Sequence, residues 1–426
     1  MYNSKGIIIN SISKLKKGYL EIEFTVPDSV ERFFNEKSFF SSYSISIDSV
    51  PDSILSIPLL ANLLPVAWAN DVNLFIDEVD ETFYESIPVL KDAFQKMYPK
   101  LNLGGHLIAN KIVKNEANNL SRSSQLFSGG IDSLTTYIRR SNETPYLVTI
   151  WGADVRLDEF EAWEQVRNYN SKLAKDLKTE IVFVKSNFKE FLNQGQLKDE
   201  FGEIVISWWA GVQHGLGLSG LCAPITYEKG LGTFYIGSSH TVDYKLPYGS
   251  HPSIDNNIKW GSTNVIHDSY DLTRQEKINM IADYITNKYG SLQIRVCWLP
   301  EGNGGNCNEC EKCSRTIIGL ILAGLDPNQH GFYVSNSFPS HVKKQFETQK
   351  WKITEAIAFQ WQDVQDHIPH NLNFENSDYR DLFIWLKNYK LRHYQPSLLI
   401  RVRLMVAKAL PERSKRILKK IIRVEN

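Results

Sequence analysis

Residues 127–133, FSGGIDS, have the types and the order of an anion-binding loop. Apolar residues predict a short strand that ends at Phe127, and the pattern from Asp132 or Ser133 onward predicts a helix. Glycines let backbone N–H groups approach phosphate oxygens, and a helix N-terminus adds free donors and the positive end of its dipole. We expect the phosphate-holding residues to be Phe127, Ser128, Gly129, Gly130, Ile131, Asp132 and Ser133. The alternative is a purely structural Ser-Gly-Gly turn.

Asp132 is unusual in such a loop, because a carboxylate beside phosphate groups should repel them. Two explanations are open: the side chain caps the helix, or it faces a magnesium ion that bridges the phosphates. No lysine follows the glycines, so the stretch is not a GxxxxGK[ST] loop, and it is not GxGxxG either.

Four of the five cysteines form a second cluster with the spacing of a metal site. The pattern is Cys297-x9-Cys307-x2-Cys310-x2-Cys313, and two residues between thiolates allow a tight turn to direct both at one ion. Four thiolates fill a tetrahedral zinc shell, so we expect a closed, structural Zn²⁺ site. An iron–sulfur cluster and free thiols are the alternatives. Cys222 stands apart, and we expect it to be a buried, inert thiol.

Composition excludes some classes of function. The 426 residues include 48 Lys or Arg and 48 Asp or Glu, so the whole molecule is not an electrostatic nucleic-acid binder. The most apolar stretch, residues 54–69, is too short to span a bilayer and is interrupted by Pro58 and Pro65, so we expect it to be a buried helix–turn segment. Without a recognisable secretory signal, we expect a cytoplasmic protein with no membrane contact.

The pattern of elements predicts three regions. Residues 1–120 are expected to be an α+β accessory domain, with strands at 19–26, 42–48 and 73–77 and a helix at 86–97. Residues 121–326 alternate strands and helices, which predicts an α/β domain whose parallel sheet has helices on both faces. Its strands are expected at 125–127, 146–151, 181–184, 234–237 and 293–297, and its helices at 133–140, 157–177, 207–221 and 273–288. Asp158 and Thr273 are the expected N-caps.

Residues 327–426 are expected to be mostly helical. Between positions 401 and 423 there are nine Lys or Arg residues and one acid, Glu412. This stretch predicts either an amphipathic helix that packs on the body with a solvated basic face, or a surface for a nucleic acid or a protein partner.

The motif SGGxDS resembles the pyrophosphate loop of the N-type ATP pyrophosphatases. Together with the later cysteine cluster, its order and spacing resemble 7-cyano-7-deazaguanine synthase, an enzyme of queuosine precursor biosynthesis. Further similar segments are YIGSSHTVD at 235–243, HDSYDLTRQEKI at 267–278 and CNECEKCSRT at 307–316. The resemblance covers residues 123–325, about half of the chain.

The resemblance implies an adenine-nucleotide α-hydrolase-like fold and a reaction with ATP and Mg²⁺. A carboxylate, such as a deazapurine acid, would be adenylated with release of pyrophosphate, and an amine would then displace AMP to form an amide, a nitrile or a conjugate. Asp132, Asp243 and Arg274 are the catalytic residues that it implies. Arg274 stands where the family has lysine, and either Arg274 or Lys245 could neutralise phosphate charge.

Two segments depart from the family. WGADVRL at 151–157 and ISWWAGVQHG at 206–215 replace motifs that help to shape the deazapurine pocket, so the usual substrate is in question. Trp208 and Trp209 could stack on a planar heterocycle or pack in the core. The added terminal regions resemble the enlarged relatives found in bacterial anti-phage operons, which implies protein partners through these regions and ammonia, a protein or a nucleic acid as the amine donor.

Two other functions remain open from the sequence. One is a tRNA-modifying ATP pyrophosphatase, which the basic tail favours and the scarcity of cysteines outside the cluster disfavours. The other is a non-catalytic scaffold that retains the nucleotide fold, against which the complete SGGIDS loop argues weakly. The sequence leaves the substrate, the amine donor and the oligomeric state undetermined.

Overall fold

The computed structural model describes residues 6–116, 122–297, 299, 302–371 and 377–394. The chain divides into two compact units, residues 1–335 and 336–426. This division differs from the three regions expected, because no boundary falls near residue 120. The basic stretch at 401–423 lies outside the described residues.

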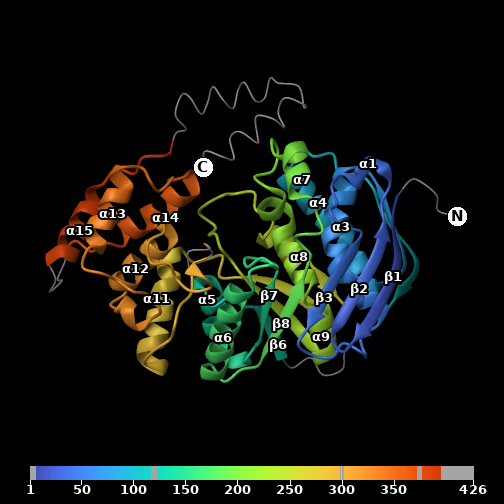
Figure 1. Ribbon diagram of the computed structural model, residues 1–426, viewed down its shortest axis with the longest axis horizontal. Coiled ribbons are helices and arrows are strands. Elements are labelled where there is room, and N and C mark those ends of the chain that lie inside the picture. Colours follow the sequence, from blue (N-terminus) through green and yellow to red (C-terminus); the bar gives the residue numbers. More distant parts are fainter. Residues whose placement is uncertain (1–5, 117–121, 298, 300–301, 372–376, 395–426) are drawn as a thin grey trace. The chain divides into compact units, whose positions relative to one another are not determined.

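One large, mostly parallel sheet of eleven strands forms the frame of the first unit. Its spatial order is β10-β11-β9-β6-β7-β8-β3-β2-β1-β4-β5. Figure 1 labels the middle of this order, where β8 is followed by β3, β2 and β1. The strands are β1 (Gly6–Lys16), β2 (Tyr19–Thr25), β3 (Ser38–Tyr43), β4 (Asn73–Asp80), β5 (Leu107–Val113), β6 (Arg122–Leu126), β7 (Tyr146–Trp151), β8 (Ile181–Ser186), β9 (Leu231–Gly237), β10 (Lys259–Trp260) and β11 (Thr263–Asp268).

The N-terminal strands extend the sheet instead of forming a separate domain. β3 pairs antiparallel with β8, with Ser41 opposite Ser186 and Tyr43 opposite Val184. The sheet therefore runs without a break from the expected accessory region into the α/β region. Its core is also continuous, since one cluster of buried apolar side chains includes residues of β2, β8 and β9.

The central strands β8, β7, β6, β9 and β11 are parallel to one another. The chain starts at β6, adds β7 and β8 on one side, and then returns to add β9 and β11 on the other. The order therefore reverses between β6 and β9. In open α/β sheets, ligands bind outside the carboxyl ends of the strands at such a reversal.

Helices cover both faces of these strands. α5 (Ile131–Arg139) and α6 (Phe160–Asp176) follow β6 and β7, whereas α7 (Gln194–Phe201), α8 (His214–Gly220) and α9 (Ala223–Lys229) lie in the return connection to β9. Because crossovers between parallel strands are right-handed, the two directions of travel place α5 and α6 on one face and α8 and α9 on the other (Figure 1).

The N-terminal strands are covered by α1 (Asp28–Glu31), α2 (Asp52–Leu55), α3 (Ile57–Ala69) and α4 (Glu81–Met97). The apolar stretch at 54–69 begins in the last turn of α2 and continues as α3, whose residues from Ile57 to Trp68 are all buried. Pro58 lies in the first turn, where its missing N–H costs no helical hydrogen bond. Within the described part of the chain, no helix has the length and apolar character needed to cross a membrane.

The remaining elements of the first unit are α10 (Pro252–Asp255), α11 (Arg274–Tyr284) and α12 (Glu311–Leu322), with π-helical turns at Trp209–Gln213 and Ile285–Tyr289 and 3₁₀ turns at Ser141–Glu143 and Pro327–Gln329. Thr273 caps α11 in a capping box with Glu276, as predicted. The prediction for Asp158 was wrong, because α6 begins after Glu159 and the Asp158 carboxylate pairs with Arg156 instead.

The strand expected at 293–297 is absent, and β11 takes its place in the sheet. The 293–297 segment is extended, but its N–H groups have other partners. Ile294 donates to the His330 carbonyl, Arg295 donates to the Gly129 carbonyl, and the next two N–H groups donate to the Asn306 side chain.

The described part of the second unit is helical, as expected. It comprises α13 (Phe338–Glu347), α14 (Glu355–Asp366) and α15 (Ser377–Asn388). Phe346 lies at the centre of its aromatic core, with ring centroids 4.8 Å from Trp361 and 5.4 Å from Trp351.

Candidate active site and metal centre

The glycine loop lies at the carboxyl end of β6, where the strand order reverses. Phe127 and Ile131 are buried and anchor its two ends. The Ser133 hydroxyl accepts a hydrogen bond from the Ser128 N–H at 3.3 Å and donates to the Gly130 carbonyl at 3.1 Å. α5 begins at Ile131, directly after the glycines, so the N-terminal end of this helix faces the loop.

Gly129 is required by the geometry of the loop. Its φ is +76°, and a Cβ atom there would lie 2.4 Å from the Tyr169 ring and 2.8 Å from Asn170 Oδ1. Both neighbours belong to α6, which packs closely behind the loop. A side chain at this position would therefore displace the loop.

A cavity of about 190 Å³ opens beside the loop. The carboxyl ends of three neighbouring strands, β6, β7 and β9, surround it. Its lining includes Phe127, Ser128, Asp132, Ser133, Thr149, Ile150, Asp154, Trp163, Trp209, His214, Gly237, Ser239, Arg295 and Lys312. The structure thus brings most of the expected loop residues to one pocket at the reversal point.

Asp132 neither caps α5 nor presents a free carboxylate to the pocket. Its two oxygens pair with Arg274 at 3.1 Å and with Lys277 at 3.2 Å, and these basic side chains are only 10% and 2% exposed. Burial alone would raise the pKa of Asp132, but the positive charges of Arg274, Lys277 and Lys312 outweigh it and lower the pKa to about 2. Asp132 is therefore the anion that holds two buried cations beneath the loop.

Arg274 and Asp243 lie in different surroundings. Arg274 is brought to the loop through Asp132, as the first residue of α11. Asp243 is exposed on the segment after β9 and is not among the residues that line the pocket, and Lys245 lines a separate groove. We therefore assign no role at the pocket to Asp243 or Lys245.

Three basic residues near the loop were not found by sequence reasoning. Lys277 follows Arg274 by three positions, so the helical period could have placed both on one face of α11. Arg295 donates two hydrogen bonds to the Ser128 carbonyl, at 3.1 and 3.3 Å, and one to the Cys297 carbonyl at 3.1 Å. Lys312 lies between two of the clustered cysteines and lines the pocket. No local motif indicated these last two.

Aromatic rings form one wall of the pocket. Trp208 is buried in the core, whereas Trp209 lines the pocket with its ring centroid 4.9 Å from that of His214. The His214 ring is followed by Tyr248 at 5.1 Å. Burial lowers the pKa of His214, and its Nδ1 atom is buried without a hydrogen-bond partner among the described residues. The wall therefore offers flat apolar surfaces and one neutral polar group.

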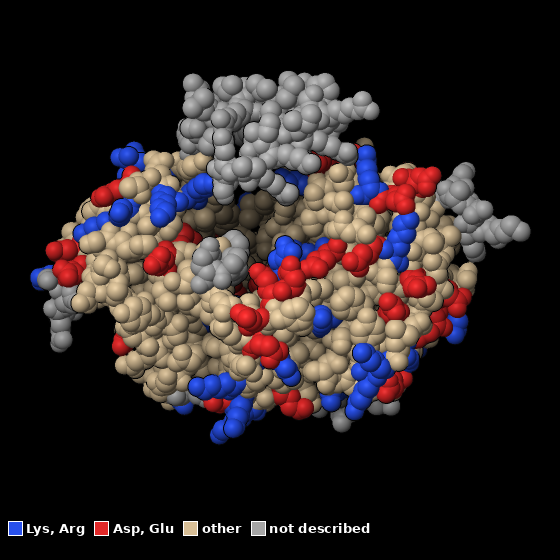
Figure 2. Space-filling view, in the orientation of Figure 1, with Lys and Arg blue, Asp and Glu red and all other residues tan. Residues whose placement is uncertain are grey.

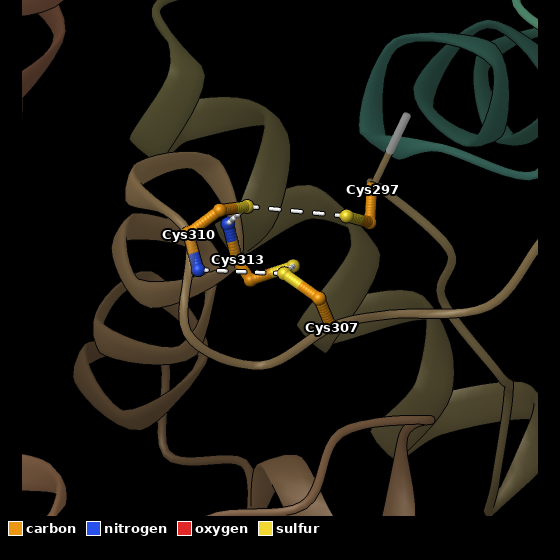
Figure 3. Close-up of side chains that lie close together, drawn as sticks. All are labelled: Cys297, Cys307, Cys310 and Cys313. Carbon is orange, nitrogen blue, oxygen red and sulfur yellow. Dashed lines mark hydrogen bonds between the residues drawn. The ribbon is translucent and has the colours of Figure 1, made fainter. Parts of the chain in front are cut away.

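The four clustered cysteines converge on one point, as the sequence predicted (Figure 3). Their sulfur atoms all lie within 4.8 Å of one another, and the Cys297–Cys310 and Cys307–Cys313 pairs are 3.9 and 3.8 Å apart. Four thiolates about 2.3 Å from one zinc ion stand about 3.8 Å apart, so the group fits a tetrahedral metal. The N–H groups of Cys310 and Cys313 donate to the sulfur atoms of Cys307 and Cys310 at 3.4 Å.

We expect about one equivalent of zinc per chain, and its loss when Cys307 is replaced by serine, because three thiolates hold the ion much less firmly than four. Metal analysis after dialysis measures both. Cys222→Ala is the matched control, since this thiol is fully buried away from the cluster and the variant should keep its metal. Iron with acid-labile sulfide would identify an iron–sulfur cluster instead, and less than about half an equivalent of any metal would contradict the site.

Charge on the surface agrees with the balanced composition. Lys and Arg side chains are interspersed with Asp and Glu side chains over the face shown in Figure 2.

No protein-family model, curated protein or solved structure matches this chain. The functional inference therefore rests on the geometry of the loop, the pocket and the cysteine cluster.

Proposed function

We propose that the chain is an ATP-dependent adenylating enzyme of the 7-cyano-7-deazaguanine synthase type, acting on a planar carboxylic acid such as a deazapurine acid. The observation that carries this proposal is the position of the SGGIDS loop. It connects β6 to α5 at the point where the strand order reverses, beside a pocket with a basic floor and an aromatic wall. This combination suits a nucleotide and a flat acid.

In the first step, a carboxylate oxygen of the acid attacks the α-phosphorus of ATP and the bond to the β-phosphate oxygen breaks. Pyrophosphate leaves, and an acyl-adenylate remains. The N–H groups of the loop would hold the pyrophosphate at the start of α5, and stabilising this leaving charge is the largest contribution that the protein can make. In the second step, an amine attacks the acyl carbon and AMP leaves, with one proton lost from the amine.

The remaining residues suit this chemistry. A magnesium ion would neutralise phosphate charge, and Asp154 is the carboxylate best suited to hold it, since it is exposed at the pocket while both Asp132 oxygens are engaged. Trp209 offers a face on which a heterocycle could stack. The cysteines do not favour sulfur transfer, because Cys222 is fully buried and the other four form the cluster.

The test is formation of AMP and pyrophosphate from ATP and magnesium with a deazapurine carboxylic acid, in the presence and absence of ammonia or a primary amine. We expect AMP to appear only with the acid and to be at least about tenfold slower in Ser128→Ala, because the variant loses a hydroxyl donor at the loop. Activity without the acid would point to another substrate class. No AMP with any acid or amine would overturn the enzymatic proposal, and equal rates in wild type and Ser128→Ala would overturn the part that this hydroxyl plays in it.

A further inference from the structure

Lys312 is the one Lys or Arg side chain lining the pocket that forms no hydrogen bond or ion pair with a described residue, although the carboxylates of Asp132 and Asp154 attract its charge from a greater distance. Two Lys or Arg side chains line the pocket, Arg295 and Lys312. Arg295 is already engaged, because all three nitrogens of its guanidinium donate to the carbonyls of Ser128 or Cys297. Lys312 is half-buried, and its ammonium forms no hydrogen bond or ion pair with any described residue.

The two basic residues deeper in the site are also occupied. Arg274 and Lys277 share the Asp132 carboxylate, and Lys277 donates in addition to the Ser238 carbonyl. A ligand could recruit these groups only by breaking buried ion pairs, which is costly. Lys312 can meet an incoming anion without such a loss.

The position of Lys312 is not explained by helix stability. It is the second residue of α12, where the helix dipole is positive, so a lysine there is unfavourable by about 0.3–1 kcal/mol. Partial burial of an unpaired ammonium adds a desolvation cost. Both costs would be offset by an anion in the pocket.

The cysteine cluster fixes the direction of this side chain. Lys312 directly precedes Cys313, and the turn that carries it is held by the hydrogen bond from the Cys313 N–H to the Cys310 sulfur at 3.4 Å. On the other side of the cluster, the Cys297 carbonyl holds Arg295. Both basic residues at the pocket are therefore attached to the metal-ligand segments.

We infer that Lys312 binds the phosphate groups of a di- or triphosphate in this pocket, and that the four-cysteine centre positions it there. This inference rests on the proposed function, which places a polyphosphate at the loop. It assigns the metal centre a part in ligand binding besides its structural one: bound metal holds the turn that presents the ammonium. The ligand class is a phosphate anhydride and not a single carboxylate, because Ser128 and Ser133 of the loop line the same pocket as Lys312, so that the loop and the ammonium can each contact a phosphate group of one ligand.

The experiment measures binding of two separate probes, inorganic pyrophosphate and adenosine, by calorimetry with the zinc-loaded protein. Lys312→Met should bind pyrophosphate about 10- to 100-fold more weakly and adenosine unchanged, because only the charged contact is lost. Lys312→Arg should recover part of the loss. Lys198→Met removes an exposed lysine on α7 and should alter neither affinity.

Failure of this inference and failure of the proposed function give different results. Equal pyrophosphate affinity in wild type and Lys312→Met, with adenosine bound by both, overturns the role of Lys312 alone. Binding of neither probe by the wild type overturns the proposed function and this inference together.

The role of the metal is tested by a thermodynamic cycle that combines metal depletion with the Lys312→Met substitution. Metal-depleted wild type should lose pyrophosphate affinity by the same factor as Lys312→Met, and depletion of Lys312→Met should cause no further loss. If depletion lowers the pyrophosphate affinity of wild type and of Lys312→Met by the same factor, or if it abolishes adenosine binding, the metal does not act through Lys312. Either result would overturn the positioning role.

Discussion

Asparagine in place of Asp132 is expected to lower the free energy of unfolding by about 3–5 kcal/mol, because it leaves Arg274 and Lys277 buried without their shared anion. Chemical denaturation of the full chain measures this loss. Asp158→Asn is the matched control, since it removes an exposed ion pair with Arg156 and should cause no measurable change. Equal stability of the two variants would contradict the buried arrangement at Asp132.

The same ion pairs predict a dependence of stability on acid pH. The pKa of Asp132 lies at about 2 in the folded protein against an ordinary value of 3.8, so the folded state binds this proton less readily than the unfolded chain does. The resulting stabilisation, about 2 kcal/mol, is fully present above about pH 4 and is lost as the pH falls towards 2. The difference in stability between wild type and Asp132→Asn should therefore shrink over this range, and a constant difference would contradict the assignment.

Alanine at Gly129 is expected to lower the rate of AMP formation at least about 100-fold, because a small displacement of groups around a reacting centre has an effect of this size. The added Cβ would overlap the Tyr169 ring and the Asn170 side chain, and the loop must move away from the helix that supports it. The assay for AMP and pyrophosphate described above measures the effect.

Gly324→Ala is the control that separates the backbone strain of alanine at a positive φ from the collision of its Cβ atom with neighbouring side chains. Gly324 also has a positive φ, +80°, but a Cβ atom there would meet nothing within 4 Å. The control therefore shares the backbone strain without the collision, and its rate of AMP formation should equal that of the wild type. A similar loss of activity in both variants would show that displacement of the loop is not the cause.

The N-terminal residues have a structural part in this molecule that their sequence did not reveal. Through the pairing of β3 with β8 they extend the sheet beyond the strands that carry the loop, and α3 contributes to the same buried cluster as α8. Truncation near residue 120 would expose this edge and this apolar surface, so experiments on the proposed activity require the full chain.

The sequence by itself determined the features whose residues are neighbours along the chain. The loop at 127–133, the start of α5 and the four-cysteine cluster all depend on spacings of a few residues, so glycine positions, helix periodicity and cysteine intervals were sufficient to place them. The apolar stretch at 54–69 was correctly predicted to be buried for the same reason, because local composition decides burial there.

Only the tertiary structure decided the contacts between distant segments. Asp132 meets Lys277 across 145 positions and the Ser128 carbonyl meets Arg295 across 167, and no local pattern specifies such partners. The alternation at 293–297 suggested a strand, but its N–H groups are taken by a carbonyl of the glycine loop and by the Asn306 side chain. Periodicity reports which side of a segment is apolar, whereas hydrogen-bond partners are chosen by whichever segments the fold brings alongside.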